Sequence, residues 1–151
     1  MNTLLTFLRD HRDRLDLNGL AATDRLSCVL MTPRFRASRH VLFFVLPEGS
    51  PDPVLVAKVA RLAGTSESVE REAANLRGVQ AGRKGGFDSV PRVVAFEEYC
   101  GRSILIETAL VGSPMDPAVM RRHLAACCKG VTDWLVDLQL ATTAPNAADP
   151  Q

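Results

Sequence analysis

The spacing of the apolar runs constrains the fold of this chain more than any other feature. Three runs of five to seven residues follow one another closely, and segments rich in proline, arginine, serine or glycine separate them. The runs cover residues 27–31, 40–46 and 54–60. Their length is typical of β-strands, and the connections are too short for the crossover helices that parallel strands need. The sequence therefore predicts an antiparallel meander.

Helical periodicity begins after the third run. Val69, Ala73 and Leu76 recur at intervals of three or four residues and so share one side of a helix. A Gly-Thr-Ser loop at residues 64–66 precedes them, and Ser66 offers a capping hydroxyl at the helix start. We expect a helix at this point of the chain.

Two more strand candidates follow this helix. They cover residues 90–96 and 103–108, and Cys100-Gly101-Arg102 between them fits a tight turn. Together these patterns predict an α+β fold, in which a five-stranded antiparallel sheet carries one helix inserted after its third strand.

Helices are also expected at both ends. Residues 2–16 place leucines among Asp and Arg, which is typical of an amphipathic leading helix. Asp116-Pro117 combines a capping side chain with a proline at the first helical position. The C-terminal helical pattern is expected to bend or divide at Gly130. Its apolar stripe consists of Leu124, Cys127, Val131, Trp134, Leu135 and Leu138.

These patterns divide the chain into four segments. Residues 1–20 contain the N-terminal helix, residues 21–111 the sheet with its inserted helix, and residues 112–141 the C-terminal helices. Residues 142–151 are small, polar and proline-containing, and this composition predicts a disordered tail.

The composition disfavours several classes of function. The 151 residues include 18 Lys+Arg and 17 Asp+Glu, and the net charge of +1 predicts no general attraction to nucleic acid or to an anionic membrane. No apolar stretch approaches the roughly 20 residues that span a bilayer. The first ten residues lack the basic start of a secretory signal. We expect a cytoplasmic protein.

The cysteines show no spacing typical of a metal site. They are Cys28, Cys100, Cys127 and Cys128. Buried structural thiols are the simplest interpretation, and we assign no metal to them. The alternative is a zinc or redox site that is assembled without a sequence pattern.

The most informative pair is a lysine in the third run and a glutamate on the following helix. Lys58 and Glu72 lie 14 positions apart, and Glu72 flanks the apolar stripe of its helix. Glu70 lies about 200° around the helix and is expected to face elsewhere. A lysine near nucleotide phosphates needs a carboxylate to hold its flexible side chain, as in protein kinases. Alternatively, Lys58 is a strand-edge lysine and Glu72 a solvated helix residue.

The order of these elements resembles the N-lobe of the aminoglycoside phosphotransferase and choline kinase superfamily, whose members share the protein-kinase fold. The resemblance covers roughly residues 25–140. The matching segments are Val54-Leu55-Val56-Ala57-Lys58, Glu70-Arg71-Glu72-Ala73-Ala74-Asn75-Leu76, Val90-Pro91-Arg92-Val93, Ile104-Leu105-Ile106-Glu107-Thr108 with Gly112 after it, and Trp134-Leu135-Val136-Asp137-Leu138. Residues 21–111 would then form a kinase-like N-lobe, and residues 112–141 the helices that follow its hinge.

The resemblance implies a site for ATP. Its residues would be Val56, Ala57, Lys58, Glu72, Glu107, Thr108 and Ala109. In such a site Lys58 contacts the phosphates, Glu72 orients Lys58, and Val56 and Ala57 lie near adenine. The backbone of residues 107–109 hydrogen-bonds adenine.

The connection between the first two strands would lie over the phosphates in this fold. Residues 32–39 contain no glycine, which normally lets a loop bring its N–H groups close to phosphate. Three arginines either replace these contacts electrostatically or solubilise a hairpin. No segment has the spacing of a P-loop.

The residues that catalyse transfer in the resembled family have no match. An H-G-D-x-x-x-x-N loop and a later metal-binding aspartate are both missing from the sequence. His11-Arg12-Asp13 spells the kinase tripeptide, but it precedes every strand and lacks the required asparagine. We therefore expect a truncated N-lobe of an enzyme that phosphorylates a small-molecule hydroxyl. It would be catalytically incompetent alone, and Mg²⁺ would require the missing lobe.

The helices of residues 112–141 would pack against the second lobe in that family. Their apolar stripe is therefore expected to fold back onto the sheet, to form a homodimer, to bind a chain that carries a C-lobe, or to leave the protein marginally stable. An alternative function is a non-catalytic protein-interaction module on the same scaffold.

Overall fold

The structure is a computed structural model in which residues 3–11, 15, 25–31, 40–62, 66–112 and 116–143 are described. Within these residues five strands form one sheet, namely β1 (Leu26–Met31), β2 (His40–Pro47), β3 (Leu55–Ala60), β4 (Val93–Tyr99) and β5 (Arg102–Thr108). The helices of the same residues are α1 (Thr3–Asp10), α2 (Glu67–Ala81), α3 (Pro117–Arg122) and α4 (Leu124–Thr142).

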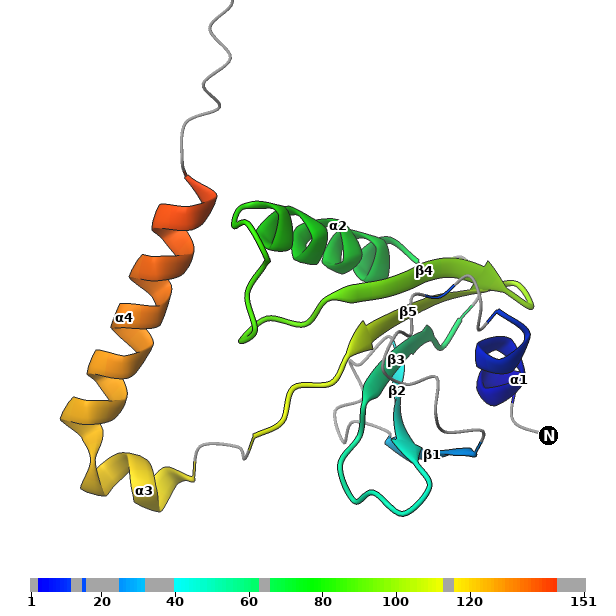
Figure 1. Cartoon of the computed structure of the whole chain (residues 1–151), viewed down its shortest axis with the longest axis horizontal. Helices are drawn as coiled ribbons and strands as arrows, with labels where there is room; N and C mark the ends of the chain where they lie inside the picture. Colours follow the sequence, from blue (N-terminus) through cyan, green and yellow to red (C-terminus); the bar gives the residue numbers. More distant parts are fainter. Residues whose placement is uncertain are drawn as a thin grey trace, which may run out of the picture.

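The strands lie in the order β1-β2-β3-β5-β4, and every neighbouring pair is antiparallel. The first three strands form the expected meander. Helix α2 then carries the chain from β3 to the far edge of the sheet, and β5 returns between β4 and β3 (Figure 1). The predicted α+β fold with a five-stranded antiparallel sheet and an inserted helix is confirmed.

One face of the sheet packs against α1. Leu4, Phe7 and Leu8 of this helix are buried in a cluster with apolar side chains of four strands. The strand members of the cluster are Val45, Leu55, Ala57, Ala95, Ile104 and Ile106. Most of the hydrophobic core therefore lies on this face.

The other face is covered by α2 above β4 and β5. Val69 and Ala73 of the helix are buried against Leu105, as their helical spacing predicts. Successive side chains of a strand point to opposite faces. Because Ala57 belongs to the α1 face, Lys58 points to the α2 face.

The tight turn and one helix start are as expected. Cys100 and Gly101 have φ angles of 53° and 71°, and two successive positive φ angles are typical of a two-residue hairpin turn. Asp116 accepts a hydrogen bond of 2.5 Å from the backbone N–H of Ala118 at the start of α3.

Other local expectations are wrong. Ser66 precedes α2 but makes no capping hydrogen bond through its side chain. The C-terminal helices divide at His123, whose backbone leaves the helical region, and α4 continues unbroken through Gly130. A single glycine inside a helix costs about 1 kcal/mol relative to alanine, which a 19-residue helix tolerates. Thr142, expected in the tail, still belongs to α4.

The cysteines also differ from expectation. None of the four forms a disulfide, but Cys100 and Cys128 are exposed and Cys28 and Cys127 are half-buried, so none is a fully buried core residue. Residues 32–39 and 144–151, for which a phosphate-covering loop and a tail were predicted, lie outside the described residues. Among the described helices, none is sufficiently long and apolar to cross a membrane.

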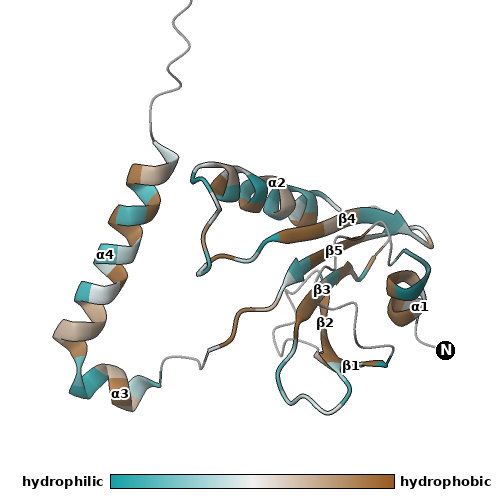
Figure 2. Ribbon diagram, in the orientation of Figure 1, coloured by the Kyte–Doolittle hydropathy of each residue, from teal (hydrophilic) through white to brown (hydrophobic). Residues whose placement is uncertain are grey.

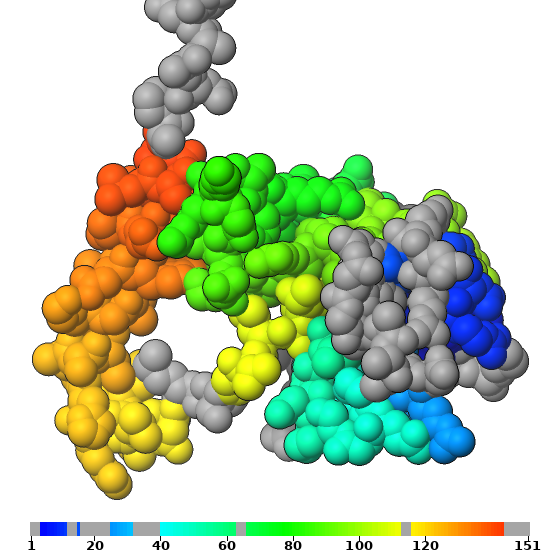
Figure 3. Space-filling model, viewed as in Figure 1, coloured from blue at the N-terminus to red at the C-terminus, as the bar shows by residue number. Residues whose placement is uncertain are grey.

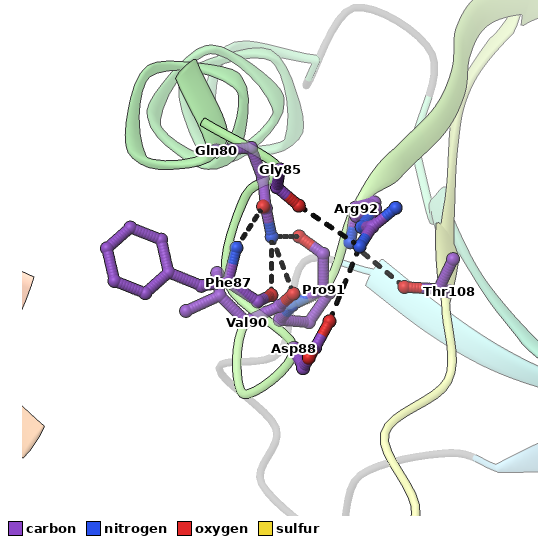
Figure 4. Close-up of polar contacts among 8 residues, drawn as sticks. All are labelled: Gln80, Gly85, Phe87, Asp88, Val90, Pro91, Arg92 and Thr108. Carbon is purple, nitrogen blue, oxygen red and sulfur yellow. Dashed lines mark hydrogen bonds and ion pairs between the residues drawn. The ribbon is translucent and has the colours of Figure 1, made fainter. Parts of the chain in front are cut away.

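Gln80 organises the loop between α2 and β4 (Figure 4). Its side-chain amide donates hydrogen bonds to the carbonyls of Phe87, Val90 and Pro91 at 3.1, 2.6 and 3.2 Å. Its carbonyl oxygen accepts the N–H of Phe87 at 2.8 Å. One side chain at the end of α2 thus contacts four backbone groups of the loop, with its two N–H groups shared among three carbonyls.

Helices α3 and α4, residues 116–143, form a C-terminal arm that contacts the rest of the protein at one end. Arg83 pairs with Asp137 at 3.4 Å, and the Trp134 indole donates to Ser89 at 2.8 Å. Figure 3 shows α3 and the first half of α4 standing clear of the strands, and Figure 2 shows apolar residues along α4. The large exposed apolar side chains of the arm are Val119, Met120, Leu124, Val131, Trp134, Leu135, Val136 and Leu140.

Replacing Gln80 with alanine should destabilise the protein by about 2 kcal/mol, because it leaves several loop N–H and C=O groups without partners. Thermal unfolding followed by circular dichroism would measure the change. Gln139→Ala on the exposed side of α4 is a matched control and should have little effect. Equal melting temperatures for the two variants would contradict this role of Gln80.

The C-terminal arm should bind a dye that fluoresces on apolar surfaces. Replacing Val131 and Leu135, which are 47% and 51% exposed, with glutamine should lower the fluorescence while changing stability by about 0.5 kcal/mol or less. The control is Leu62→Gln, which changes an exposed leucine outside the arm. An undiminished signal in the double variant would show that the arm is covered in solution.

Candidate functional site

Lys58 lies in the middle of β3, on the face that α2 covers in part. Its cross-strand neighbours are Leu42 on β2 and Leu105 on β5. Leu105 is fully buried beneath α2, and the Lys58 side chain is 15% exposed. A lysine in this position keeps its charge inside the fold only if it finds partners there.

Glu72 on α2 is the first partner. Its Oε1 lies 2.5 Å from the Lys58 Nζ, and its side chain is 37% exposed. The neighbouring apolar residues Val69 and Ala73 dock α2 onto the sheet, and this docking turns Glu72 toward Lys58. The structure thus brings together the pair that the sequence singled out, and Glu70 lies exposed on the helix.

Glu107 near the end of β5 is the second partner. Its Oε1 lies 2.7 Å from the Lys58 Nζ, and its side chain is only 5% exposed. The other carboxylate oxygen, Oε2, is buried and has no hydrogen-bond partner. We call Lys58, Glu72 and Glu107 the Lys58 triad.

Sequence reasoning missed this role of the Glu107 side chain. A signal was available, because Glu107 directly follows the apolar residues 104–106, and side chains two apart on a strand share a face. Glu107 therefore shares the face of Leu105, which lies beside Lys58. The register between β3 and β5, which places the two charges within reach, is not readable from the sequence.

The two carboxylates keep Lys58 charged. Burial alone would lower the pKa of Lys58, but hydrogen bonds to Glu107 and Glu72, together with their charges, outweigh burial and raise the pKa above its ordinary value. With two carboxylates facing one ammonium, the Lys58 triad carries one negative charge in excess.

An apolar strip lies beside the triad on the same face. Val56 is two residues from Lys58 on β3, and Phe44 and Leu42 are the β2 neighbours of Val56 and Lys58. All three apolar side chains are half-buried. Helix α2 packs mainly on β4 and β5, so contact with this helix does not explain why these three side chains are half-buried.

The other predicted site residues are placed differently. The Ala57 side chain is buried on the opposite face of the sheet, in the cluster with α1, so it points away from the side chain of Lys58. The backbone N–H of Thr108 donates to the carbonyl of Arg92 at 2.9 Å, and that of Ala109 to the carbonyl of Val54 at 3.0 Å. These two N–H groups therefore form hydrogen bonds within the fold. Figure 4 shows that the Thr108 hydroxyl also accepts a hydrogen bond from the backbone N–H of Arg92. Their contact with adenine stays a prediction.

Other features of the described residues do not add to this site. Those residues contain no group of three or more His, Cys, Asp or Glu side chains placed to hold a metal ion. A pocket of about 250 Å³ lies on the α1 face and is lined by residues that include Leu4, Tyr99 and Arg102. It does not include any member of the Lys58 triad.

Comparison of the chain with protein-family models, with curated proteins and with solved structures found no match. The family resemblance inferred from the sequence therefore stays a prediction. Any function proposed for this chain rests on the geometry of the Lys58 triad and on the order of the elements that carry it.

Replacing Lys58 with methionine should destabilise the protein by about 3 kcal/mol, because it leaves the buried carboxylate of Glu107 without a counter-charge. The measurement is chemical unfolding in urea. Lys84→Met removes an exposed lysine from a loop and should cost little.

A second substitution tests the cause. If the cost comes from the unpaired Glu107 carboxylate, Lys58→Met combined with Glu107→Leu should recover most of the lost stability, because two apolar side chains replace a broken buried ion pair. Additive losses in the double variant would show that the two residues are not coupled.

Proposed function

We propose that this chain is a nucleotide-binding, kinase-like N-lobe that resembles the aminoglycoside phosphotransferase and choline kinase superfamily. The observation that carries the proposal is the ion pair of 2.5 Å between Lys58 on the third strand and Glu72 on the helix that follows it. Kinases use a lysine and a glutamate on these two elements to hold nucleotide phosphates.

The chemistry of Lys58 is compatible with phosphate binding. An ammonium group has three N–H donors, and the two carboxylates of the triad occupy two of them. No other described residue contacts the third donor in the contacts of Lys58, and we propose that it binds a phosphate oxygen. Because the pKa of Lys58 is raised, the group carries its charge at neutral pH.

The apolar strip supplies a surface for the base. Val56 and Phe44 lie next to each other across β2 and β3, on the same face as Lys58. A flat aromatic base gains free energy by covering such side chains, and its phosphates would then extend toward the lysine. ATP is the nucleotide we propose.

The activity proposed for the family is transfer of the ATP γ-phosphate to a hydroxyl of a small molecule. That step requires a carboxylate at the attacking hydroxyl and acidic groups that hold Mg²⁺. The proposal assigns no described residue to either task. The role proposed for this chain is contact with the nucleotide.

A second candidate function is a non-catalytic protein-interaction module on the same scaffold. The observation that favours it is the C-terminal arm, whose Val131, Trp134 and Leu135 are 47%, 39% and 51% exposed. Its partner would be a second copy of the chain or a chain that carries a kinase-like C-lobe.

Titration with a fluorescent ATP analogue tests the first function. The wild-type chain should bind saturably, and the variant that combines Lys58→Met with Glu107→Leu should bind at least about tenfold more weakly than Glu107→Leu alone, because it has lost a charged hydrogen-bond donor. Lys84→Met is the control for a general loss of positive charge and should bind as the wild type does.

Equal affinities for Glu107→Leu and the double variant would contradict the proposal. Absence of binding at millimolar nucleotide in every variant that retains Lys58 would favour the interaction module.

A further inference from the structure

The two carboxylates of the Lys58 triad differ in what happens when Lys58 leaves them. Glu72 is 37% exposed, so water can solvate its carboxylate. Glu107 is 5% exposed, and its Oε2 already lacks a hydrogen-bond partner. Moving the ammonium away would leave the Glu107 carboxylate buried and unpaired, which is strongly unfavourable.

Glu107 therefore holds Lys58 more firmly than Glu72 does. A phosphate that approaches Lys58 must either draw it away from Glu107 or share it with two carboxylates. In the second case the phosphate meets a cluster that already has one negative charge in excess. The negative charges of the phosphate and of this cluster repel each other appreciably when both contact the same ammonium group in a partly buried site.

Resting on the proposed function, we propose that Glu107 is a specificity-determining residue of the Lys58 site, because its carboxylate competes with anionic ligands for the lysine. A single lysine–glutamate pair is electrically neutral and accepts a phosphate readily. With Glu107 present, the site binds a phosphate weakly. It favours a nucleotide whose negative charge is reduced by a bound divalent cation, compared with the same nucleotide without the cation.

Neutralising Glu107 tests this role. Glu107→Gln has nearly the same shape, keeps an acceptor for Lys58 and removes the excess charge. It should bind metal-free ATP analogue about tenfold more tightly than the wild type. The gain should be smaller for the magnesium complex of the same analogue, because that ligand carries less negative charge. A purely structural effect would not depend on ligand charge.

Two further variants complete the design. Glu107→Leu also removes the charge, and it replaces Glu107→Gln if the buried amide prevents folding, which thermal unfolding would reveal. Glu70→Gln removes the same charge from an exposed position of α2 and should bind as the wild type does. This control separates the effect of Glu107 from a change in net charge.

The outcomes separate this inference from the proposed function. Tighter binding in the Glu107 variants, with a larger gain for the metal-free analogue than for its magnesium complex, supports both, whereas an equal gain for the two ligands overturns the role of Glu107. Binding by the wild type that the Glu107 variants leave unchanged or weaken overturns the role of Glu107 while the proposed function stands. Absence of binding in the wild type and in both Glu107 variants at millimolar nucleotide overturns the proposed function and this inference together.

Discussion

The ammonium group of Lys58 links the elements that meet on the α2 face of the sheet. Its ammonium contacts a carboxylate from α2 at 2.5 Å and one from β5 at 2.7 Å, so three elements that are distant in sequence meet at one atom. The apolar contacts of α2 with the sheet involve Val69, Ala73 and Leu105. A small apolar contact of this kind leaves the position of a helix loosely determined, and the ion pair with Glu72 adds a directional constraint.

The sequence predicts the elements well because their signals are local. Short apolar runs, a positive-φ turn at Cys100-Gly101 and the Asp116 cap each depend on a few neighbouring residues. The pairing of Lys58 with Glu72 was predictable because helical periodicity fixes which glutamate flanks the apolar stripe. The role of Glu107 was not, since it depends on the register between β3 and β5 and on which face the intervening α2 covers.

The C-terminal arm shows where local signals reach their limit. Helical periodicity predicted an apolar stripe around Val131, and the structure confirms the helix but leaves much of that stripe exposed among the described residues. Of the expected outcomes, folding back onto the sheet is not what these contacts show, because Asp137 and Trp134 of α4 contact Arg83 and Ser89 in the loop between α2 and β4. Helical periodicity in a sequence identifies the apolar face of a helix. It does not identify the partner of that face, because the partner is determined by the surface that packs against it.

Under the proposed function, Glu107 would affect stability and ligand binding in opposite ways. Its pairing with Lys58 allows a lysine to occupy the interior of the sheet, since a buried ammonium without a close carboxylate would be costly. The same pairing lowers the affinity of Lys58 for any other anion. A site that needed only tight phosphate binding would be served better by Glu72 alone, because its partly exposed carboxylate can release the lysine at lower cost. If Lys58 binds a nucleotide as proposed, the buried carboxylate at the end of β5 would therefore make that binding conditional on the charge that the ligand brings.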